Sequence, residues 1–160
     1  MKVHTMTRSL RIDRPLDEVF AFFAKPENLA LITPSSLNFH ILTPEPIDMA
    51  VGTLIDYTIK IMGMRVFWRT LITRFDPPYE FVDEQLEGPY KMWHHRHSFR
   101  TIDSGTLIED NVTYALPFSF IGDIVHGIYV RRNLDRIFDF RATAISEIFE
   151  TQASEGQMGR

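Results

Sequence analysis

The sequence has no cysteine, which excludes disulfide bonds, cysteine-ligated zinc and thiol catalysis and fits an intracellular protein. It also has no apolar run near the roughly 18 residues that a transmembrane helix needs. The first residues, Met-Lys-Val-His-Thr-Met, lack the charged and then apolar pattern of an export signal. We therefore expect a cytoplasmic protein without membrane insertion.

Positive charge is also scarce. Lysine and arginine together number 17 against 21 aspartates and glutamates, which gives a net charge of −4. No dense basic run compensates locally, so a nucleic-acid partner is not expected. The Gly-x-Ser-x-Gly motif of many hydrolases and the glycine-rich loop that holds phosphates are absent too. The sequence therefore favours neither a hydrolase nor a nucleotide-binding protein.

Aromatic residues are plentiful by comparison. The 160 residues, enough for one domain with a full core, include 13 Phe, 5 Tyr and 2 Trp. Aromatic side chains in this number exceed the need of a simple core, and they are typical of ligand cavities. We predict a single ligand-binding domain over residues 1–150 and a polar, disordered tail over residues 151–160.

Hydrophobic periodicity gives the order of the elements. Residues 3–12 alternate between polar and apolar, which predicts a first strand. Two short helices are expected next, one around Phe20 and one over residues 27–32. Further alternation, interrupted by glycine and proline turns, predicts six more strands. These strands are expected at residues 37–41, 55–61, 66–73, 81–86, 92–102 and 106–116. From about Ser119 the apolar period becomes helical, which predicts a long C-terminal helix.

This order predicts an α+β fold, with a seven-stranded curved antiparallel sheet around the long helix and two short helices after the first strand. A sheet of that length must curl because its strands twist. The long helix is the only predicted element large enough to cover the concave face of the sheet. A sheet that curves around a helix leaves space between the two, so we expect an internal cavity.

Strand alternation also identifies the side chains that face this cavity, since residues i, i+2 and i+4 share one face of a sheet. Two groups are expected to bind a ligand, namely aromatic and aliphatic wall residues and a few polar anchors. The ten residues are Tyr57, Trp68, Gln85, Trp93, His95, His97, Phe99, Asp110, Val112 and Tyr114. The same alternation turns Thr70, Ile72, Phe81 and Asp83 inward. A ligand can satisfy buried polar groups of this kind, and they in turn orient it.

His95 and His97 form the sharpest local pattern. Two imidazoles at i and i+2, together with Asp110, could bind zinc or non-haem iron. We favour hydrogen-bonded histidines without a metal, because no third ligand has diagnostic spacing, and we expect no cofactor. The same three residues are the candidates for acid–base catalysis on a bound carbonyl compound. The alternative for Asp110 is a buried carboxylate that accepts hydrogen bonds from Gln85 and Tyr114.

Several short motifs together resemble a known superfamily. They are Pro26-Glu27-Asn28-Leu29, Ile32-Thr33-Pro34, Gly52-Thr53, Phe81-Val82-Asp83-Glu84-Gln85, Gly88-Pro89-Tyr90, Trp93-His94-His95, and Ile137-Phe138 preceding Arg141. With these motifs residues 3–150 resemble the START-related, pollen-allergen-like SRPBCC superfamily, and within it the branch labelled "cell division inhibitor". The resemblance implies a helix-grip fold with a deep cavity between the sheet and the C-terminal helix.

Three functions are compatible with these observations. The first is the binding or carriage of a small hydrophobic molecule, lipid-like or polyketide-like, in the cavity. The second is a cyclase, dehydratase or isomerase that acts on a cavity-bound carbonyl compound. The third is a protein-interaction module with an exposed patch at Phe118 and Phe120.

Overall fold

The computed structural model describes residues 1–117 and 122–158, with side chains throughout these ranges except in 122–126 and 155–158. It has seven strands, a short and a long α-helix and two 3₁₀ helices. In chain order these are β1 (Val3–Ile12), α1 (Leu16–Phe23), the 3₁₀ helices η1 (Pro26–Ile32) and η2 (Ser35–Leu37), β2 (His40–Ile41), β3 (Leu54–Ile61), β4 (Met64–Asp76), β5 (Glu80–Glu87), β6 (Met92–Ile102), β7 (Gly105–Ala115) and α2 (Gly122–Met158). The predicted α+β helix-grip fold is confirmed.

All seven strands belong to one antiparallel sheet in the order β1-β7-β6-β5-β4-β3-β2. The six later strands follow one another as a meander, and β1 closes the order by pairing with β7. Met62 and Gly63 join β3 to β4 with positive φ angles of 50° and 77°. A two-residue turn with positive φ at both positions matches the twist of its strands, so this turn fixes the register of the hairpin.

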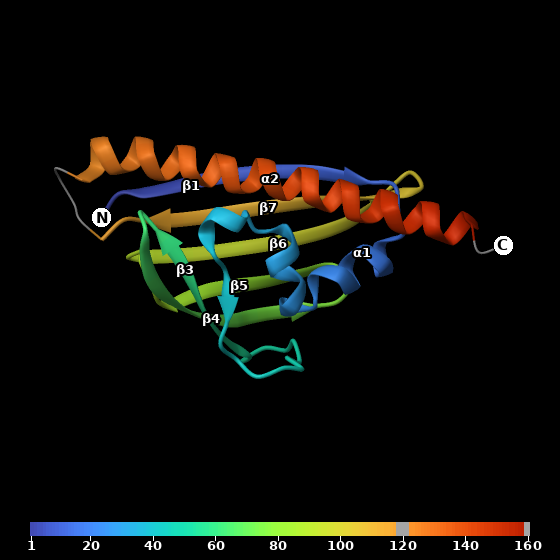
Figure 1. Cartoon of the computed structure of the whole chain (residues 1–160), viewed down its shortest axis with the longest axis horizontal. Helices are drawn as coiled ribbons and strands as arrows, with labels where there is room; N and C mark the ends of the chain where they lie inside the picture. The colour runs from blue at the N-terminus through green and yellow to red at the C-terminus, as the bar shows by residue number, and fades with distance from the viewer. Residues whose placement is uncertain (118–121, 159–160) are drawn as a thin grey trace.

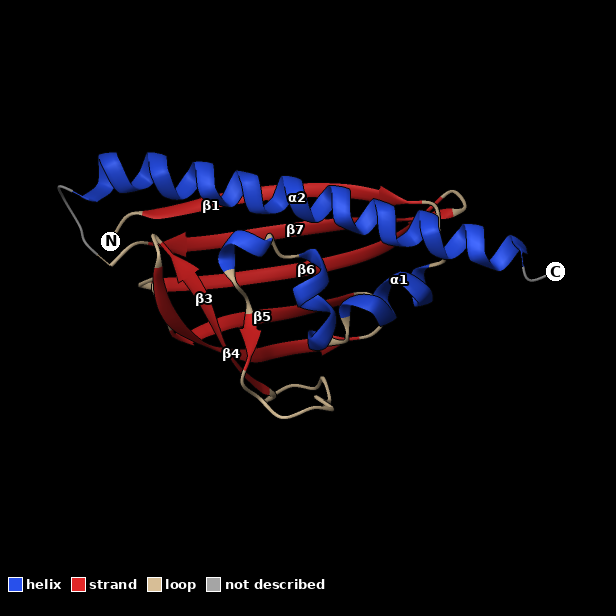
Figure 2. Ribbon diagram, viewed as in Figure 1, coloured by secondary structure: helices blue, strands red, loops and turns tan. Residues whose placement is uncertain are grey.

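The helices gather on one face of the sheet (Figure 2). Helix α2 runs along β1 and β7, and α1 with the two 3₁₀ helices lies beside it over the same face (Figure 1). Arg8 of β1 holds α2 in place through Asp135 at 2.7 Å and Asp139 at 2.8 Å. The concave face of the sheet is therefore covered partly by α2 and partly by the segment from α1 to η2.

Two clusters of buried side chains lie between the sheet and the helices. One lies around α1 and the C-terminal half of α2, and it contains Ile12, Val19, Phe20, Ile32, Phe81, Phe99, Ile108, Ile145 and Phe149. The other lies under the middle of α2, and it contains Met6, Trp68, Trp93, Val112, Tyr114, Leu134 and Phe138. None of the described helices has a stretch long and apolar enough to cross a bilayer.

One predicted strand boundary is wrong. Residues 37–39 do not belong to a strand, since η2 occupies Ser35–Leu37 and β2 spans only His40–Ile41. Asn38 has a left-handed φ of 44°, which a strand does not accept. The expected start of the long helix near Ser119, and the patch at Phe118 and Phe120, fall outside the described residues.

The C-terminal tail also differs from the prediction. Helix α2 continues to Met158, so residues 151–158 are helical rather than disordered. Thr151 and Ser154 are exposed, and their hydroxyls donate to the carbonyls of Glu147 and Glu150 one turn earlier. Glutamate, glutamine and alanine favour a helix even without a buried face, which explains why polarity alone was a poor guide here. The limit of the domain at residue 150 stays a prediction.

Two phenylalanines of α2 test how much the buried face of this helix contributes to stability. Phe149 is 3% exposed and its ring centroid lies 5.5 Å from that of Phe22, whereas Phe140 is 43% exposed. We expect Phe149→Ala to lower the free energy of unfolding by about 3–5 kcal/mol, and Phe140→Ala by less than about 1 kcal/mol. Urea denaturation of both variants measures the difference, and equal losses would contradict the packing described above.

Candidate functional site

A cavity of about 180 Å³ lies between the sheet and the helices. Strands β3 to β6 form its floor, α2 forms one wall, and α1, η1 and η2 form another. Most of its lining is aromatic or aliphatic. Both tryptophans of the chain, Trp68 and Trp93, line it. The expected internal cavity is therefore present, and a molecule bound in it would lie next to both tryptophan fluorophores.

Five of the ten residues predicted to bind a ligand line this cavity. They are Tyr57, Trp68, Trp93, His95 and His97. The structure places the other five outside the lining. They are Gln85, Phe99, Asp110, Val112 and Tyr114. Val112 and Tyr114 pack in one cluster with Leu134 and Phe138 of α2. Phe99 packs against Phe20 and Phe23 of α1, and Gln85 hydrogen-bonds the backbone of Tyr90.

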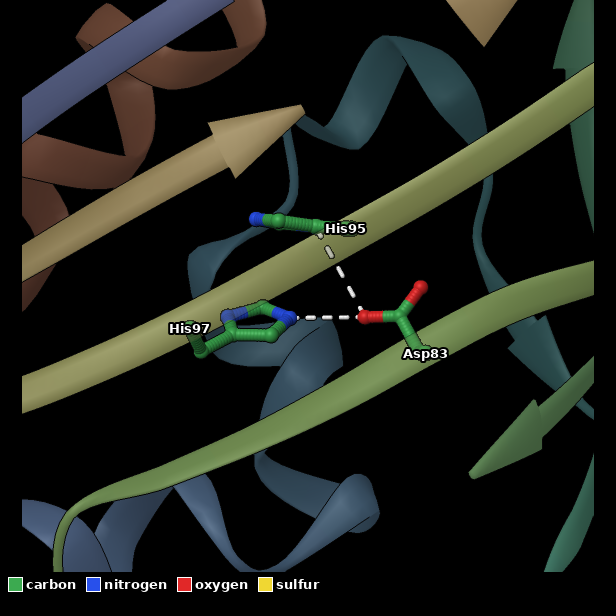
Figure 3. A group of neighbouring side chains, drawn as sticks. All are labelled: Asp83, His95 and His97. Atoms are coloured by element: carbon green, nitrogen blue, oxygen red, sulfur yellow. Dashed lines mark hydrogen bonds and ion pairs between the residues drawn. The ribbon is translucent and has the colours of Figure 1, made fainter. Parts of the chain in front are cut away.

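The polar part of the site is a closed ring of four side chains. The register places Asp83 of β5 opposite His95 of β6, and His97 of β6 opposite Asp110 of β7. Nε2 of His95 lies 2.8 Å from Oδ1 of Asp110, and Nε2 of His97 lies 2.7 Å from Oδ2 of Asp83. Figure 3 shows how Asp83, His95 and His97 converge. We call these four residues the imidazole–carboxylate ring.

The remaining two contacts of the ring are weaker. Nδ1 of His97 lies 3.1 Å from Oδ1 of Asp110, at an angle that is poor for a hydrogen bond. Nδ1 of His95 lies 3.6 Å from Oδ2 of Asp83, which is too long for one. Each imidazole therefore has one aspartate next to one of its nitrogens and the second aspartate next to the other. The contact between His95 and Asp83 is the longest of the four.

Counting protons explains this asymmetry. Ionised carboxylates only accept hydrogen bonds, so an imidazole nitrogen at hydrogen-bond distance from one needs an N–H, and a neutral imidazole supplies only one. Two charged imidazoles would supply four, but the ring centroids of His95 and His97 are 3.7 Å apart, where two positive charges repel each other. We infer that the two imidazoles share three N–H protons, which supplies more hydrogen bonds than two neutral rings and avoids two adjacent positive charges. The long contact indicates that Nδ1 of His95 is the nitrogen without a proton.

The pKa values of the ring follow the same assignment. Burial and the charge of His97 lower the pKa of His95, and the carboxylates oppose this only in part. Burial alone would lower the pKa of His97, but its contacts with Asp110 and Asp83 raise it above the ordinary value. Burial alone would raise the pKa of both aspartates, yet the imidazoles bring each below its usual range. His97 is therefore the imidazole that holds the positive charge in preference to His95, and both aspartates ionise more readily than free carboxyl groups.

Arg141 of α2 supplies a further charge at the cavity wall. The central carbon of its guanidinium lies 4.9 Å from the centroid of the Phe138 ring. Its Nε is buried and has no hydrogen-bond partner in the described part of the chain. Burial also raises the pKa of Tyr57 and Tyr90, two further lining residues, so both phenols stay neutral and can donate hydrogen bonds.

Sequence reasoning missed part of this set. Asp83 was placed inward but not assigned to the site, and its signal was its position between Phe81 and Gln85 on one strand face. Arg141 entered only through a motif of the family resemblance. Its own signal is a charged residue within the apolar stripe that continues from Phe138 to Ile145.

The expected hydrogen bonds to Asp110 are also different. Gln85 clamps the backbone of Tyr90, since its Nε2 donates to the Tyr90 carbonyl at 2.7 Å and its Oε1 accepts from the Tyr90 N–H at 3.1 Å. Tyr114 stacks on His4 with ring centroids 5.3 Å apart. The histidines contact Asp110 instead, because β6 lies between β5 and β7 in the sheet.

Three side chains offer ligand atoms for a metal. One atom each from Asp83, His95 and His97 lies within 4.8 Å of the others. However, the 2.7 Å between Nε2 of His97 and Oδ2 of Asp83 is a hydrogen-bond distance, whereas two ligands around tetrahedral zinc stand about 3.3 Å apart. The arrangement is that of a hydrogen-bonded group, and a metal would have to break its shortest contact.

Comparisons with known proteins address the fold and the family. Residues 12–139 match the family model for "Polyketide cyclase / dehydrase and lipid transport". The Zhui aromatase/cyclase from Streptomyces sp. R1128 is similar in structure, with a TM-score of 0.73 and 16% identity over 95% of this chain and 96% of that one. A START superfamily protein from Mycobacterium smegmatis gives a TM-score of 0.71 and 11% identity over 93% and 99%.

A third similar structure is the protein TTHA0849 from Thermus thermophilus, with a TM-score of 0.71 and 15% identity over 94% of this chain and 99% of that one. The comparison with curated proteins gives no match. The START superfamily protein shares the fold that the resemblance implied, while the "cell division inhibitor" branch stays a prediction. Because the family model matches well over half of its length, the chain belongs to the polyketide cyclase/dehydrase and lipid transport family.

Proposed function

We propose that this protein binds and carries a small hydrophobic molecule in the cavity between the sheet and α2. The observation behind this proposal is the composition of the cavity, whose aromatic and aliphatic walls meet a few polar side chains, among them the imidazole–carboxylate ring at the strands β5 and β6. An apolar pocket with a few convergent polar side chains is typical of a ligand site. The cytoplasmic location of this function stays a prediction.

The size of the cavity limits the buried part of the ligand. Its volume of about 180 Å³ is just above the roughly 150 Å³ in which an apolar cavity accommodates benzene. Sites for drug-sized ligands measure about 300–1,000 Å³. We infer that the protein buries one or two fused rings or a short chain. A longer lipid-like or polyketide-like molecule would have to leave its remainder outside.

An enzyme is the second candidate, and Nδ1 of His95 is the observation that favours it. His95 lines the cavity, and in the proton assignment above this nitrogen carries no proton. It could remove a proton from the carbon next to a bound carbonyl group, so that the C–H electron pair forms a carbon–carbon double bond and the carbonyl π pair moves to oxygen to give an enolate. Where the enolate is conjugated with a carbon–carbon double bond, return of the proton to the far carbon of that bond completes an isomerisation. Where the β-carbon carries a hydroxyl, transfer of the proton to it releases water as the enolate forms the new double bond, which completes a dehydration. An aromatase/cyclase shares the fold.

A cavity-filling variant tests the binding function. We expect 2-naphthamide, which has two fused rings and no charge, to quench the fluorescence of Trp68 and Trp93 with one-to-one saturation. Thr70 is buried in the lining, so Thr70→Phe should weaken this binding by at least about tenfold because the added ring takes up the space. Thr113→Phe, on the outer face of β7, is the matched control. Native mass spectrometry checks the stoichiometry, and equal binding by Thr70→Phe would disprove the cavity site.

Deuterium exchange tests the enzyme function. In D₂O we expect the protein to accelerate exchange at the activated C–H of 2-tetralone, a bicyclic ketone, as followed by proton NMR. His95→Gln should abolish the acceleration because it removes the basic nitrogen. His94→Gln, on the opposite face of the same strand, should retain it. Exchange at the buffer rate with the native protein would reject the enzyme candidate and leave the carrier standing.

Both candidates require the ring to be charged as described, which a stability measurement tests. Asp110→Asn leaves the charge of His97 partly uncompensated, so we expect a loss of about 3–5 kcal/mol in the free energy of unfolding. The control Asp139→Asn removes an aspartate whose side chain is 68% exposed and should cost less than about 1 kcal/mol. Urea denaturation of both variants gives the comparison.

The cost of Asp110→Asn should also depend on pH. The lowered pKa of Asp110 contributes stability above its unfolded value of about 3.9, and this is lost as pH falls through the folded value. The raised pKa of His97 contributes stability below about 6.5, and this is lost as pH rises through the folded value. The cost should therefore be largest between about pH 4 and 6.5. A cost that is independent of pH would argue against the charged ring.

A further inference from the structure

Arg141 is the charged group that the contacts within the described chain leave unexplained. It lines the cavity from α2, and its Nε is buried without a hydrogen-bond partner among the described residues. The side chain as a whole is half-buried, and a buried N–H group without a partner is unfavourable. The contact with Phe138, at 4.9 Å from the ring centroid, satisfies none of the guanidinium N–H groups.

Two other arginines of the chain pair their guanidinium groups with aspartates. Arg69 makes two hydrogen bonds of 2.8 Å with the carboxylate of Asp56. Arg8 divides its guanidinium between two aspartates of α2. The side chains of both groups are partly exposed to solvent. Arg141 is different, because it faces the cavity and no carboxylate of the described residues lies at ion-pair distance from it.

The chemistry that completes such a group is well defined. A guanidinium presents its N–H groups in a planar fork, which matches the two oxygens of a carboxylate. The aromatic residues Tyr57, Trp68 and Trp93 line the same cavity and suit an apolar ring or chain. A molecule that joins an apolar body to one carboxylate would satisfy both parts of the site.

We propose that the cavity selects a hydrophobic carboxylic acid, whose carboxylate is bound by the guanidinium of Arg141. This inference rests on the proposed binding function and adds the chemical class of the ligand. Arg141 is then a specificity residue, and the ligand supplies the hydrogen-bond partner that the described chain does not.

A matched pair of probes tests the inference. The probes are 2-naphthoate and 2-naphthamide, which have the same rings and differ mainly in charge. Titration against tryptophan fluorescence, confirmed by calorimetry, should show that the native protein binds the acid about tenfold to a hundredfold more tightly than the amide. That range corresponds to hydrogen bonds made by a charged group.

Variants of α2 assign the preference to Arg141. Arg141→Gln should bind the two probes with similar affinity while retaining the binding of the amide. Arg141→Lys keeps the charge without the fork and should restore part of the preference. Arg136→Gln is the matched control, because it removes an exposed arginine from the same helix and should leave both affinities unchanged. Circular dichroism and thermal unfolding check that each variant is folded.

The outcomes distinguish a failure of this inference from a failure of the proposed binding function. If the native protein binds both probes equally, or if the preference survives in Arg141→Gln, the inference is wrong and the carrier function stands. If neither probe binds, the binding function itself fails and the inference fails with it. If Arg141→Gln is unfolded, a preference of the native protein that is equally strong in Arg141→Lys would count against recognition by the guanidinium fork.

Discussion

The contact between two histidines and two aspartates across β5, β6 and β7 is the constraint on which the site depends. It exists only in one register, because a slip of one residue moves every side chain of a strand to the opposite face. In another register Asp83 and Asp110 would face the apolar interior without a partner, at a cost of several kcal/mol. The same register of these strands is therefore needed for their pairing, for the compensation of the buried charges and for the shape of the cavity floor.

The position of α2 decides where the cavity lies. Leu134 and Phe138 pack in one cluster with Val112 and Tyr114 of β7, and the cavity extends from these two side chains over β3 to β6. The segment from α1 to η2 covers this part, and a helix lying along one half of a curved sheet leaves a cavity between the two covers. The same helix brings Arg141 to the cavity wall, so its packing sets both the volume of the site and its positive charge.

The sequence predicted the sheet and the faces of its strands well, because alternation is a local property. Trp93, His95, His97 and Phe99 were placed on one buried face and all four are buried. Alternation does not reveal which residues contact each other across the sheet. It therefore predicts that Asp83 points inward but not that it contacts His97. Arg141 was overlooked because charged residues in a helix are ordinarily exposed, although its spacing from Phe138 and Ile145 places it on the apolar face.

The environment of His95 affects the two candidate functions, ligand binding and catalysis, differently. Its unprotonated Nδ1 can accept a hydrogen bond from a ligand as well as a proton from a C–H group. Burial and the charge of His97 lower the pKa of His95, which makes it a weaker base, and the rate of proton removal from carbon falls as the base weakens. Catalysis is then restricted to substrates with strongly activated C–H bonds, whereas hydrogen bonding to a ligand loses little. The electrostatics of the ring thus favour binding as the primary function.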